Sequence, residues 1–361
     1  MVMKNNLAWL YQIKERIPRL LKDLKGNKRP GFYHYSLSGD YFGEKIKWGL
    51  GNSTFFLKII YTLGFEKEYK QEIQEAIKFI KSFQKEDGSF SDPLVRCLSL
   101  PTRLKGSIKS LNYNKISHKQ TIQAETRQAI SSLSLFGAKP QYVYKDFPQS
   151  KNEINKYLYR LNWELPWGAG SHFSHLLFFL HYSDLKDKQE LINYSIDWID
   201  RLQHNKDGFW YHGNPFAQQK INGAMKIITG LKAVNKVRFN LAEKIINNTL
   251  LAINNEQACD NFNIVYVLKY CSEITKKSYR FNDIKSFMID RLGKYKEYYY
   301  HNMGGFSFNK NKAGQFYYGA PISRGKREVD IHGTVMFLWG ISIIAQILGI
   351  NKNLKFKEFV T

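Results

Sequence analysis

Three histidines stand at positions where an imidazole could transfer protons. His172 and His175 are three residues apart and would share one face of a helix, and His332 follows Asp330 at the start of an apolar segment. Because unperturbed imidazole titrates near neutral pH, these side chains suit acid and base catalysis. Glu125 and Asp330 add carboxyl groups to the catalytic candidates. The other interpretation of the histidines is a structural, hydrogen-bonded role at a helix start.

Polar side chains also mark the beginnings of several segments that are otherwise apolar. Burial of such groups without partners is costly, so a shared binding site is one explanation for them. Helix capping is the alternative for Asn222, Asn261 and Asp330, but it does not account for cations within apolar helices. The residues that we expect to bind a ligand are Arg127, Trp167, Trp210, Asn222, Lys226, Asn261, Tyr318, Arg324 and Lys326.

These candidates lie on elements that recur along the chain. A polar-faced segment ends at Gln203, a turn from Lys206 to Trp210 follows, and a small-residue apolar segment opens at Asn222. The same order of polar-faced helix, Gly-aromatic turn and apolar helix can be read about six times. Amphipathic helices cover a core, whereas helices that are apolar nearly all round are buried on all sides. The pattern therefore predicts alternating outer and inner helices.

The repeats predict an all-α fold, an (α/α)6 toroid of inner and outer helices around a central cavity, in a single domain over residues 1–361. Pro93 and Pro101 lie in a segment, residues 91–120, that we expect to be a long connection. The expected outer helices occupy residues 6–24, 67–83, 152–163, 189–202, 239–254 and 284–298. The expected inner helices occupy residues 52–64, 122–137, 172–182, 221–234, a segment that opens at 260, and 330–348.

The charge of the chain points to an anionic partner. The formal net charge is +23, and helix N-termini that gather at one opening of a toroid favour anions. The positive charge is spread along the whole chain without a zinc finger or a helix-turn-helix signature, which disfavours nucleic acid. The expected partner is a small-molecule or glycan anion, peripheral membrane contact stays open, and the oligomeric state is not indicated.

Cysteine usage and the lack of targeting segments predict a cytoplasmic location. Cys97, Cys259 and Cys271 are too few and too irregularly spaced for a disulfide framework. Charged residues interrupt the N-terminal segment before an apolar core of signal length forms. The longest apolar run, from Met336 to Ile350, is shorter than a membrane span.

The chain resembles the α/α toroids of the terpenoid cyclase and protein prenyltransferase superfamily. Repeats of that superfamily carry Gln-rich and Gly-aromatic turns like Gln84 to Phe90, Gln203 to Trp210 and Gly304 to Phe308. The resemblance covers nearly the whole chain and implies the fold, which unrelated sugar hydrolases, lyases and epimerases share. The acid motif of class II cyclases has several Asp residues where Glu328 to His332 has one, and no Asp-Asp-x-x-Asp motif occurs. Neither cyclase chemistry can be carried over.

Prenyltransferase β-subunits are similar to this chain in one further place. They have a metal-binding His near the start of an inner helix that follows basic residues, as His332 follows Arg324 to Arg327. Their Asp and Cys ligands come from the preceding inner helix, in an order and spacing that the adjacent Cys259 and Asp260 do not reproduce. The resemblance implies a zinc site of Cys259, Asp260 and His332. A capping Asp260 and a small buried Cys259 form the alternative.

Three functions fit these observations. The first is an enzyme that binds an anionic ligand with an apolar body, such as an isoprenoid diphosphate, whose head Arg127, Lys226 and residues 324–327 would hold. The alternative is an acid–base enzyme, a lyase, epimerase or hydrolase, on an anionic sugar or uronic acid glycan. The histidines, Glu125 or Tyr318 would then transfer protons. The third is a toroid that binds a partner without catalysis.

Overall fold

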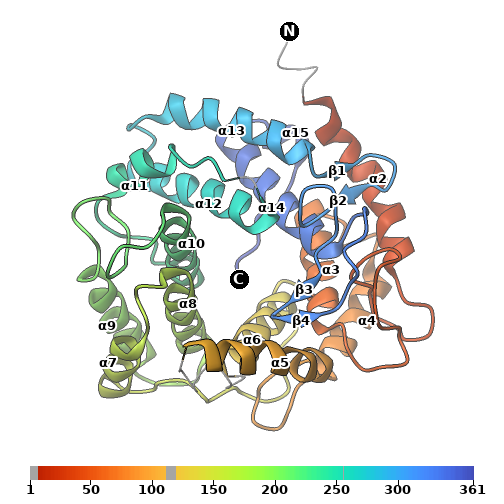
Figure 1. Cartoon of the computed structure of the whole chain (residues 1–361), viewed down its shortest axis with the longest axis horizontal. Coiled ribbons are helices and arrows are strands. Elements are labelled where there is room, and N and C mark those ends of the chain that lie inside the picture. Colours follow the sequence, from red (N-terminus) through yellow and green to blue (C-terminus); the bar gives the residue numbers. More distant parts are fainter. Residues whose placement is uncertain (1–6, 111–118, 255) are drawn as a thin grey trace. The chain divides into compact units, whose positions relative to one another are not determined.

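The computed structural model describes residues 7–110, 119–254 and 256–361, and the side chains of residues 102–110 are not described. The described chain is mostly α-helical and adds only two short antiparallel hairpins (Figure 1). The predicted all-α class is confirmed. Among the described helices, none combines the length and the apolar character that a membrane crossing requires.

The chain divides into two compact units. Unit 1 comprises residues 1–142 and 293–359, and unit 2 comprises residues 143–292 and 360–361. The boundary falls within helix α13 (Phe281–Lys296). A single domain over residues 1–361 stays a prediction.

Unit 1 places apolar helices inside and amphipathic helices outside. Helix α3 packs against α4, α6 and α14. On α3, Phe56, Ile59 and Ile60 are completely buried, and each such side chain contributes roughly 1.5–3 kcal/mol. The bounds in unit 1 are α2 (Ala8–Leu24), α3 (Leu50–Leu63), α4 (Lys70–Lys81), α5 (Pro93–Ser110), α6 (Lys119–Ser134), β1 (Tyr299–Tyr300), β2 (Gly305–Phe306), β3 (Phe316–Tyr317), β4 (Ala320–Pro321), α14 (Ile331–Ile347) and α15 (Asn351–Leu354).

Unit 2 repeats this arrangement with a very close pair of inner helices. A Cβ atom on Gly170 would lie 2.7 Å from the carbonyl oxygen of Gly223, and one on Gly223 would lie 2.8 Å from the Pro166 Cβ. The missing side chains let α8 and α10 approach closely, so small residues open both helices. The bounds in unit 2 are α7 (Lys151–Arg160), α8 (Pro166–Tyr182), α9 (Lys188–Asp200), α10 (Ala217–Ala233), α11 (Ala242–Thr249) and α12 (Ala258–Ile274).

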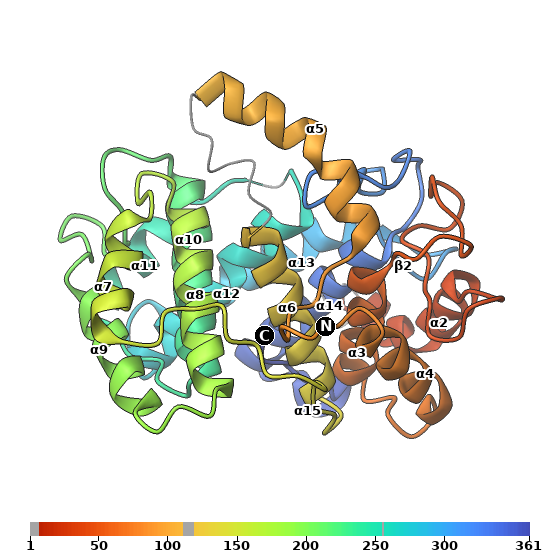
Figure 2. The same ribbon diagram turned by 90° about the horizontal axis from the view of Figure 1, so that it is seen from below.

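The segment that the sequence predicts as a long connection is largely a helix. Helix α5 begins at Pro93, where proline is well placed because the first helical residue needs no N–H acceptor. Pro101 lies inside α5. The prediction of a connection over residues 91–120 was wrong because α5 occupies residues 93–110 of this segment. Residues 111–118 lie outside the described part. Figure 2 shows α5 extending beyond the inner helices of unit 1.

Helix boundaries also decide the capping interpretations. Asp330 caps α14, since its side chain accepts a hydrogen bond from the Gly333 N–H. Helix α10 begins at Ala217 and α12 at Ala258, so Asn222 and Asn261 lie inside their helices. Capping is confirmed for Asp330 and wrong for the two asparagines.

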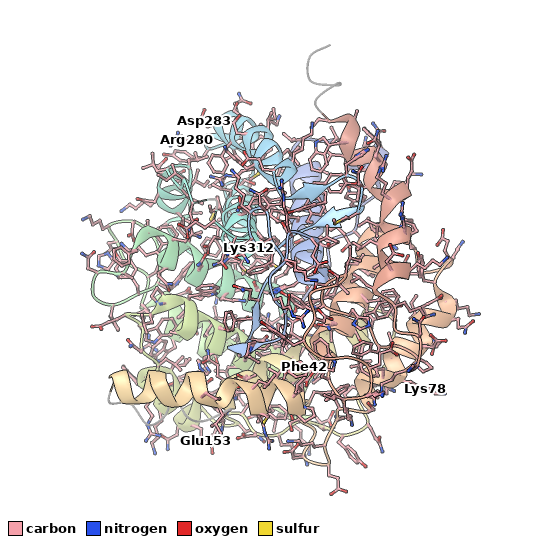
Figure 3. The ribbon with its side chains drawn as sticks, turned by 45° about the vertical axis from the view of Figure 1, so that its right-hand side comes forward. Phe42, Lys78, Glu153, Arg280, Asp283 and Lys312 are labelled. Atoms are coloured by element: carbon pink, nitrogen blue, oxygen red, sulfur yellow. The ribbon has the colours of Figure 1, made fainter. Side chains whose placement is uncertain are left out.

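Much of the charge of the chain is at the surface. Lys78 and Glu153 are exposed and their side chains point away from the ribbon (Figure 3). The exposed Arg280 donates from Nε to Asp283 Oδ2 at 2.7 Å. Exposed pairs of this kind contribute little to stability, about 0–1 kcal/mol. The informative charges are therefore the buried ones.

Candidate functional site

Asp92 connects the starts of two helices in unit 1. Its Oδ2 accepts hydrogen bonds from the backbone N–H groups of Gly49 at 2.7 Å and Leu50 at 3.2 Å, where α3 begins. Its Oδ1 accepts from Leu94 at 3.0 Å and Val95 at 3.3 Å, in the first turn of α5. Burial raises the pKa of Asp92, although these N–H donors act in the opposite direction. The carboxyl group satisfies orphan donors of both helices.

Glu125 on α6 lies next to Asp92. The backbone N–H of Asp92 donates to Glu125 Oε2 at 3.1 Å. Glu125 is buried, with only 2% of its surface exposed. Thr126 fixes this part of α6, because its Oγ1 accepts from the Phe90 N–H at 3.0 Å. Two acidic residues from different elements are thus brought together inside unit 1.

Tyr317 brings a phenol to the same place from the hairpin of β3 and β4. Its hydroxyl lies over the first turn of α3, where a Cβ on Gly51 would come within 2.5 Å of the oxygen. Burial raises the pKa of Tyr317 well above its ordinary value, and the nearby Tyr318, Glu125 and Asp92 add to the effect. The phenol therefore stays protonated at neutral pH and can donate a hydrogen bond.

His332, in the first turn of α14, lies among aromatic rings that include that of Tyr317. Its imidazole stacks on Phe55 with ring centres 4.7 Å apart, and Phe308 lies 4.6 Å away on a tilted plane. The ring of Tyr317 meets it edge-on at 6.1 Å. We call Asp92, Glu125, Tyr317 and His332 the unit 1 site.

Asp330 has a different place from that expected of a catalytic acid. Its Oδ1 accepts from the Gly333 N–H at 2.7 Å, and its Oδ2 accepts from Phe308 at 2.7 Å and Gly314 at 3.0 Å. Burial raises the pKa of Asp330 to about 7, while the backbone donors lower it. These bonds fasten the chain before α14, so the geometry favours a structural role.

A cavity of about 350 Å³ lies along α5, and neither Asp92 nor Glu125 is among the residues of its wall. Pro93, in the cavity wall, directly follows Asp92 in the sequence. Ile122, also in the wall, precedes Glu125 by three residues on α6, so Ile122 and Glu125 share one face of that helix. Arg96 supplies a positive charge to the wall. We call this space the α5 cavity; its walls are Pro93, Arg96, Cys97, Leu100 and Ile122.

The other predicted ligand-binding residues of unit 1 are more scattered. Arg127 lies two residues beyond Glu125 on α6 and is buried. Tyr318 is half-buried in the turn between β3 and β4. Arg324 is exposed with its guanidinium 5.6 Å from the ring centre of Tyr41, and Lys326 donates to Ser38. Arg324 and Lys326 thus both contact the surface loop that contains Ser38 and Tyr41.

In unit 2, the two predicted catalytic histidines have hydroxyl partners. His172 Nδ1 is 2.9 Å from the Tyr157 hydroxyl, and His175 Nε2 is 3.2 Å from the Ser171 hydroxyl. The two imidazoles meet edge-on, 6.3 Å apart. Trp167 is half-buried in the first turn of the same helix, α8.

A second buried cluster in unit 2 consists mainly of amides. Asn222 Nδ2 donates to Asp260 Oδ1 at 2.9 Å, and Asn222 Oδ1 accepts from Gln218 at 2.7 Å and Asn263 at 2.8 Å. Asp260 Oδ2 also accepts from two amides, both at 3.1 Å. We call this cluster the amide network; its members are Gln218, Asn222, Asn254, Gln257, Asp260 and Asn263.

The remaining candidates of unit 2 lie in structural surroundings. Trp210 is 1% exposed and packs edge-on against Phe239. Asn261 donates to the Gln257 carbonyl and accepts a long hydrogen bond of 3.4 Å from Arg291. Lys226 lies with its Cβ close to Gly170, at the contact of α8 with α10.

The proposed zinc ligands do not fit a metal site. Both carboxylate oxygens of Asp260 accept hydrogen bonds from side-chain amides, which a metal would have to displace. Within residues 7–110, 119–254 and 256–361, no three His, Cys, Asp or Glu side chains gather as metal ligands would. The donor set around Asp260 is that of an amide network.

Asp92 and Tyr317 are site residues that the sequence analysis missed. An Asp directly before a Pro is a helix-start signal, and this signal could have identified Asp92 as a capping residue. Nothing local in the sequence marks Tyr317 among the many tyrosines, because its position depends on the folding of the β3–β4 hairpin over α3.

Comparisons with known proteins show only distant likeness. No family model matches the chain, and no curated protein matches it. Solved structures align over most of the chain. An inactive alpha-1,6-mannanase variant from Salegentibacter is 11% identical, covers 94% of this chain and 99% of its own, and has a TM-score of 0.47.

Two further structures are similar at the same level. A cellobiose 2-epimerase from Bacillus thermoamylovorans is 10% identical over 91% of this chain and 98% of its own, with a TM-score of 0.46. A type II terpene cyclase from Scytonema is 11% identical over 97% of this chain and 98% of its own, with a TM-score of 0.41. Likeness this distant does not identify an activity for this chain.

Proposed function

We propose that the chain is an acid–base enzyme that acts on an anionic sugar, with the unit 1 site as its catalytic centre. The observation that carries the proposal is the buried Glu125 carboxyl group, which accepts a hydrogen bond from the Asp92 backbone N–H and lies near the Tyr317 phenol. A carboxyl group close to a protonated phenol suits acid–base chemistry on a sugar.

The surroundings of the two carboxyl groups favour different roles. The Asp92 carboxyl accepts four backbone hydrogen bonds, so it is a positioning residue rather than a proton carrier. Its backbone N–H holds one oxygen of Glu125. Glu125 is therefore the group that we assign to proton transfer. The protonated Tyr317 is the hydrogen-bond donor to the substrate oxygen.

The α5 cavity supports an acidic substrate. Arg96 brings a guanidinium to the cavity wall, and this planar group matches a carboxylate with two parallel hydrogen bonds. The volume of about 350 Å³ lies at the lower end of the range for small-molecule sites. A uronic acid residue combines the carboxylate for Arg96 with hydroxyl groups for the polar side chains.

An isoprenoid diphosphate fits these contacts less well. Arg324 packs on Tyr41 and Lys326 donates to Ser38, so these cations contribute to the contact between two surface loops. The described wall of the α5 cavity contains one cation, Arg96, which can balance a single carboxylate but not the larger charge of a diphosphate. We therefore favour the sugar over the isoprenoid as the substrate.

The test is an activity screen with matched charged and neutral substrates. Wild type and Arg96→Ala are incubated with oligogalacturonates, with the same oligomers after reduction of their carboxyl groups, and with farnesyl diphosphate. New reducing ends report hydrolysis, ultraviolet absorbance of a new double bond reports lyase action, and nuclear magnetic resonance reports epimerisation.

We expect wild type to convert only the acidic oligomers and Arg96→Ala to lose about tenfold in kcat/KM for them. Conversion of farnesyl diphosphate alone, or no conversion of any uronic acid oligomer, would contradict the proposal. Equal conversion of the acidic and neutral oligomers would remove the role of Arg96.

A further inference from the structure

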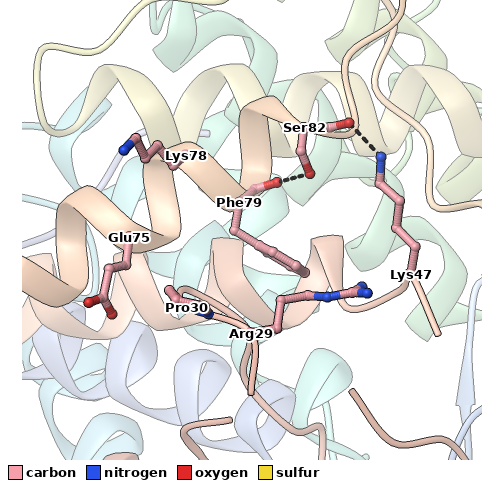
Figure 4. A pocket seen from close by; sticks show the side chains of 7 residues that line it. All are labelled: Arg29, Pro30, Lys47, Glu75, Lys78, Phe79 and Ser82. Carbon is pink, nitrogen blue, oxygen red and sulfur yellow. Dashed lines mark hydrogen bonds between the residues drawn. The ribbon is translucent and has the colours of Figure 1, made fainter. Parts of the chain in front are cut away.

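A second cavity lies on unit 1, against helix α4 and away from the residues of the unit 1 site. Its volume is about 650 Å³, which is within the range of small-molecule sites. The wall comes from α4 and from the surface segment that runs from Arg29 to Lys47 (Figure 4). We call this space the α4 groove.

Three cations surround the α4 groove. Arg29 uses Nη1 to donate to the Ile46 carbonyl at 3.1 Å, and its other guanidinium N–H groups make no hydrogen bond to the described residues. Lys47 reaches the Ser82 carbonyl at 2.7 Å, at the end of α4. Lys78 has an exposed side chain and no ion pair within the described part of the chain.

The acidic residue in the wall does not balance these charges. Glu75 Oε2 is 3.4 Å from Lys25 Nζ, a cation outside the groove wall that also lies 3.4 Å from Glu72, so Lys25 offsets the Glu75 charge only in part. One carboxylate still faces three cations of the wall. The charges that face a ligand are therefore mainly positive. An anion in the groove would be attracted by cations on more than one side.

The floor of the α4 groove is apolar. The Phe79 ring lies between Lys78 on one side and Arg29 and Lys47 on the other in Figure 4. Pro30 adds a second apolar surface. An inorganic anion would use the cations and leave this floor uncovered, whereas a compact apolar group would cover it.

We propose that the α4 groove binds a small organic anion in which a phosphate or carboxylate is attached to a compact apolar body. The acidic group contacts Arg29, on the same side of the Phe79 ring as Lys47, and Lys78 adds its positive charge from the other side. The apolar body covers Phe79 and Pro30. This binding site is separate from the catalytic assignment of the unit 1 site, and its test does not depend on enzymatic activity.

The test is isothermal titration calorimetry in a phosphate-free buffer of low ionic strength. The probes are phenyl phosphate, benzoate, phenol and inorganic phosphate, which separate the two acidic groups from the apolar body. The variants are Arg29→Ala and Lys78→Ala. The matched control is Lys81→Ala, which removes a cation from the last turn of the same helix but not from the groove wall.

We expect phenyl phosphate or benzoate to bind more tightly than phenol and inorganic phosphate. Each groove variant should weaken this binding about fivefold, and Lys81→Ala should change it less than about twofold. Preference for phenyl phosphate over benzoate, or the reverse, identifies the acidic group and supports the proposal.

Several results would overturn the proposal. These are phenol binding as tightly as the anions, inorganic phosphate binding as tightly as phenyl phosphate, and the absence of binding by both organic anions. A loss in Lys81→Ala equal to that in Lys78→Ala would also overturn it, because the effect would then be one of general surface charge. Circular dichroism of Arg29→Ala and Lys78→Ala is the check that both variants are folded.

Discussion

Unit 1 buries Asp92 under backbone N–H groups, whereas unit 2 buries Asp260 under side-chain amides. The donors to Asp92 belong to the first turns of α3 and α5 and cannot be reversed without unwinding a helix. The donors to Asp260 come from Asn222, Asn254 and Gln257. An amide group can turn over and present its oxygen instead.

This difference separates a rigid site from an adaptable one. Around Asp92 the helix starts fix the carboxyl group, and the Asp92 backbone N–H holds the neighbouring Glu125. Catalytic groups need such fixed supports. In the amide network every bond of Asp260 is made to a group that can rearrange. We therefore assign proton transfer to unit 1 and expect the amide network to stabilise the packing of α10 with α12.

Asp92→Asn should be the most destabilising of the substitutions that test this comparison. The new amide NH₂ would face backbone N–H groups that cannot turn, which leaves buried donors without acceptors. We expect a loss of about 3 kcal/mol in the free energy of unfolding. Urea denaturation of wild type and variant measures it. A loss below about 1 kcal/mol would show that the helix starts do not depend on the carboxylate.

The pH dependence of the free energy of unfolding should report the titration of Asp330, a second buried carboxyl group of unit 1. The pKa of Asp330 is about 7 in the folded chain and near its ordinary value of 3.8 in the unfolded chain. Between these values the unfolded state releases the proton that the folded state retains, so stability falls as pH rises from about 4 to 7. The raised pKa of Asp92 acts in the same direction.

Asp330→Asn should flatten this decline, because the substituted side chain no longer titrates. Denaturation of both proteins across the pH range measures the slope. A decline of the same steepness in Asp330→Asn would mean that the carboxyl group of Asp330 is not its cause.

Asp260→Asn should be milder than Asp92→Asn. The amides of Asn222, Asn254 and Gln257 can turn to restore donor and acceptor pairs, so we expect a loss of about 1 kcal/mol. The same urea experiment measures this loss. A loss equal to that of Asp92→Asn would contradict the distinction between rigid and adaptable donors.

Tyr157→Phe should have the smallest effect. It removes the hydroxyl partner of His172, and we expect a loss of about 0.5–1 kcal/mol with little change in turnover. Thermal denaturation and the substrate assay measure the two quantities separately. A loss of turnover by more than about tenfold with normal stability would move catalysis to unit 2.

The sequence predicted the helices well because their burial patterns are local. In α4, Ile73, Ala76, Ile77 and Ile80 recur at helical spacing and are buried as expected. In α3 apolar residues occur on nearly all sides of the helix, which correctly predicted burial all round. The alternation that such patterns predicted is present in each unit.

The candidate site was less predictable because its contacts are not local. Asp92 bonds to the start of α3, more than forty residues earlier in the chain, and the neighbouring prolines concealed the helix that it caps. Asn222 looked like a helix cap because its partner Asp260 lies on another helix. Of the predicted catalytic residues, Glu125 and His332 belong to the unit 1 site, and their catalytic roles stay proposals.

The most direct test of proton transfer by Glu125 compares binding with turnover in one pair of variants. Glu125→Gln keeps the shape of the side chain but removes its proton-transfer ability. Glu328→Gln is the matched control, because Glu328 is also a buried carboxyl of unit 1, 5% exposed, and bonds to the Ser38 N–H. Dissociation constants and single-turnover rates are measured with the oligogalacturonates.

We predict that Glu125→Gln binds them within about twofold of wild type and turns them over about 10²–10⁴-fold more slowly, while Glu328→Gln keeps both values. Unchanged turnover in Glu125→Gln, or the same loss in both variants, would contradict the account.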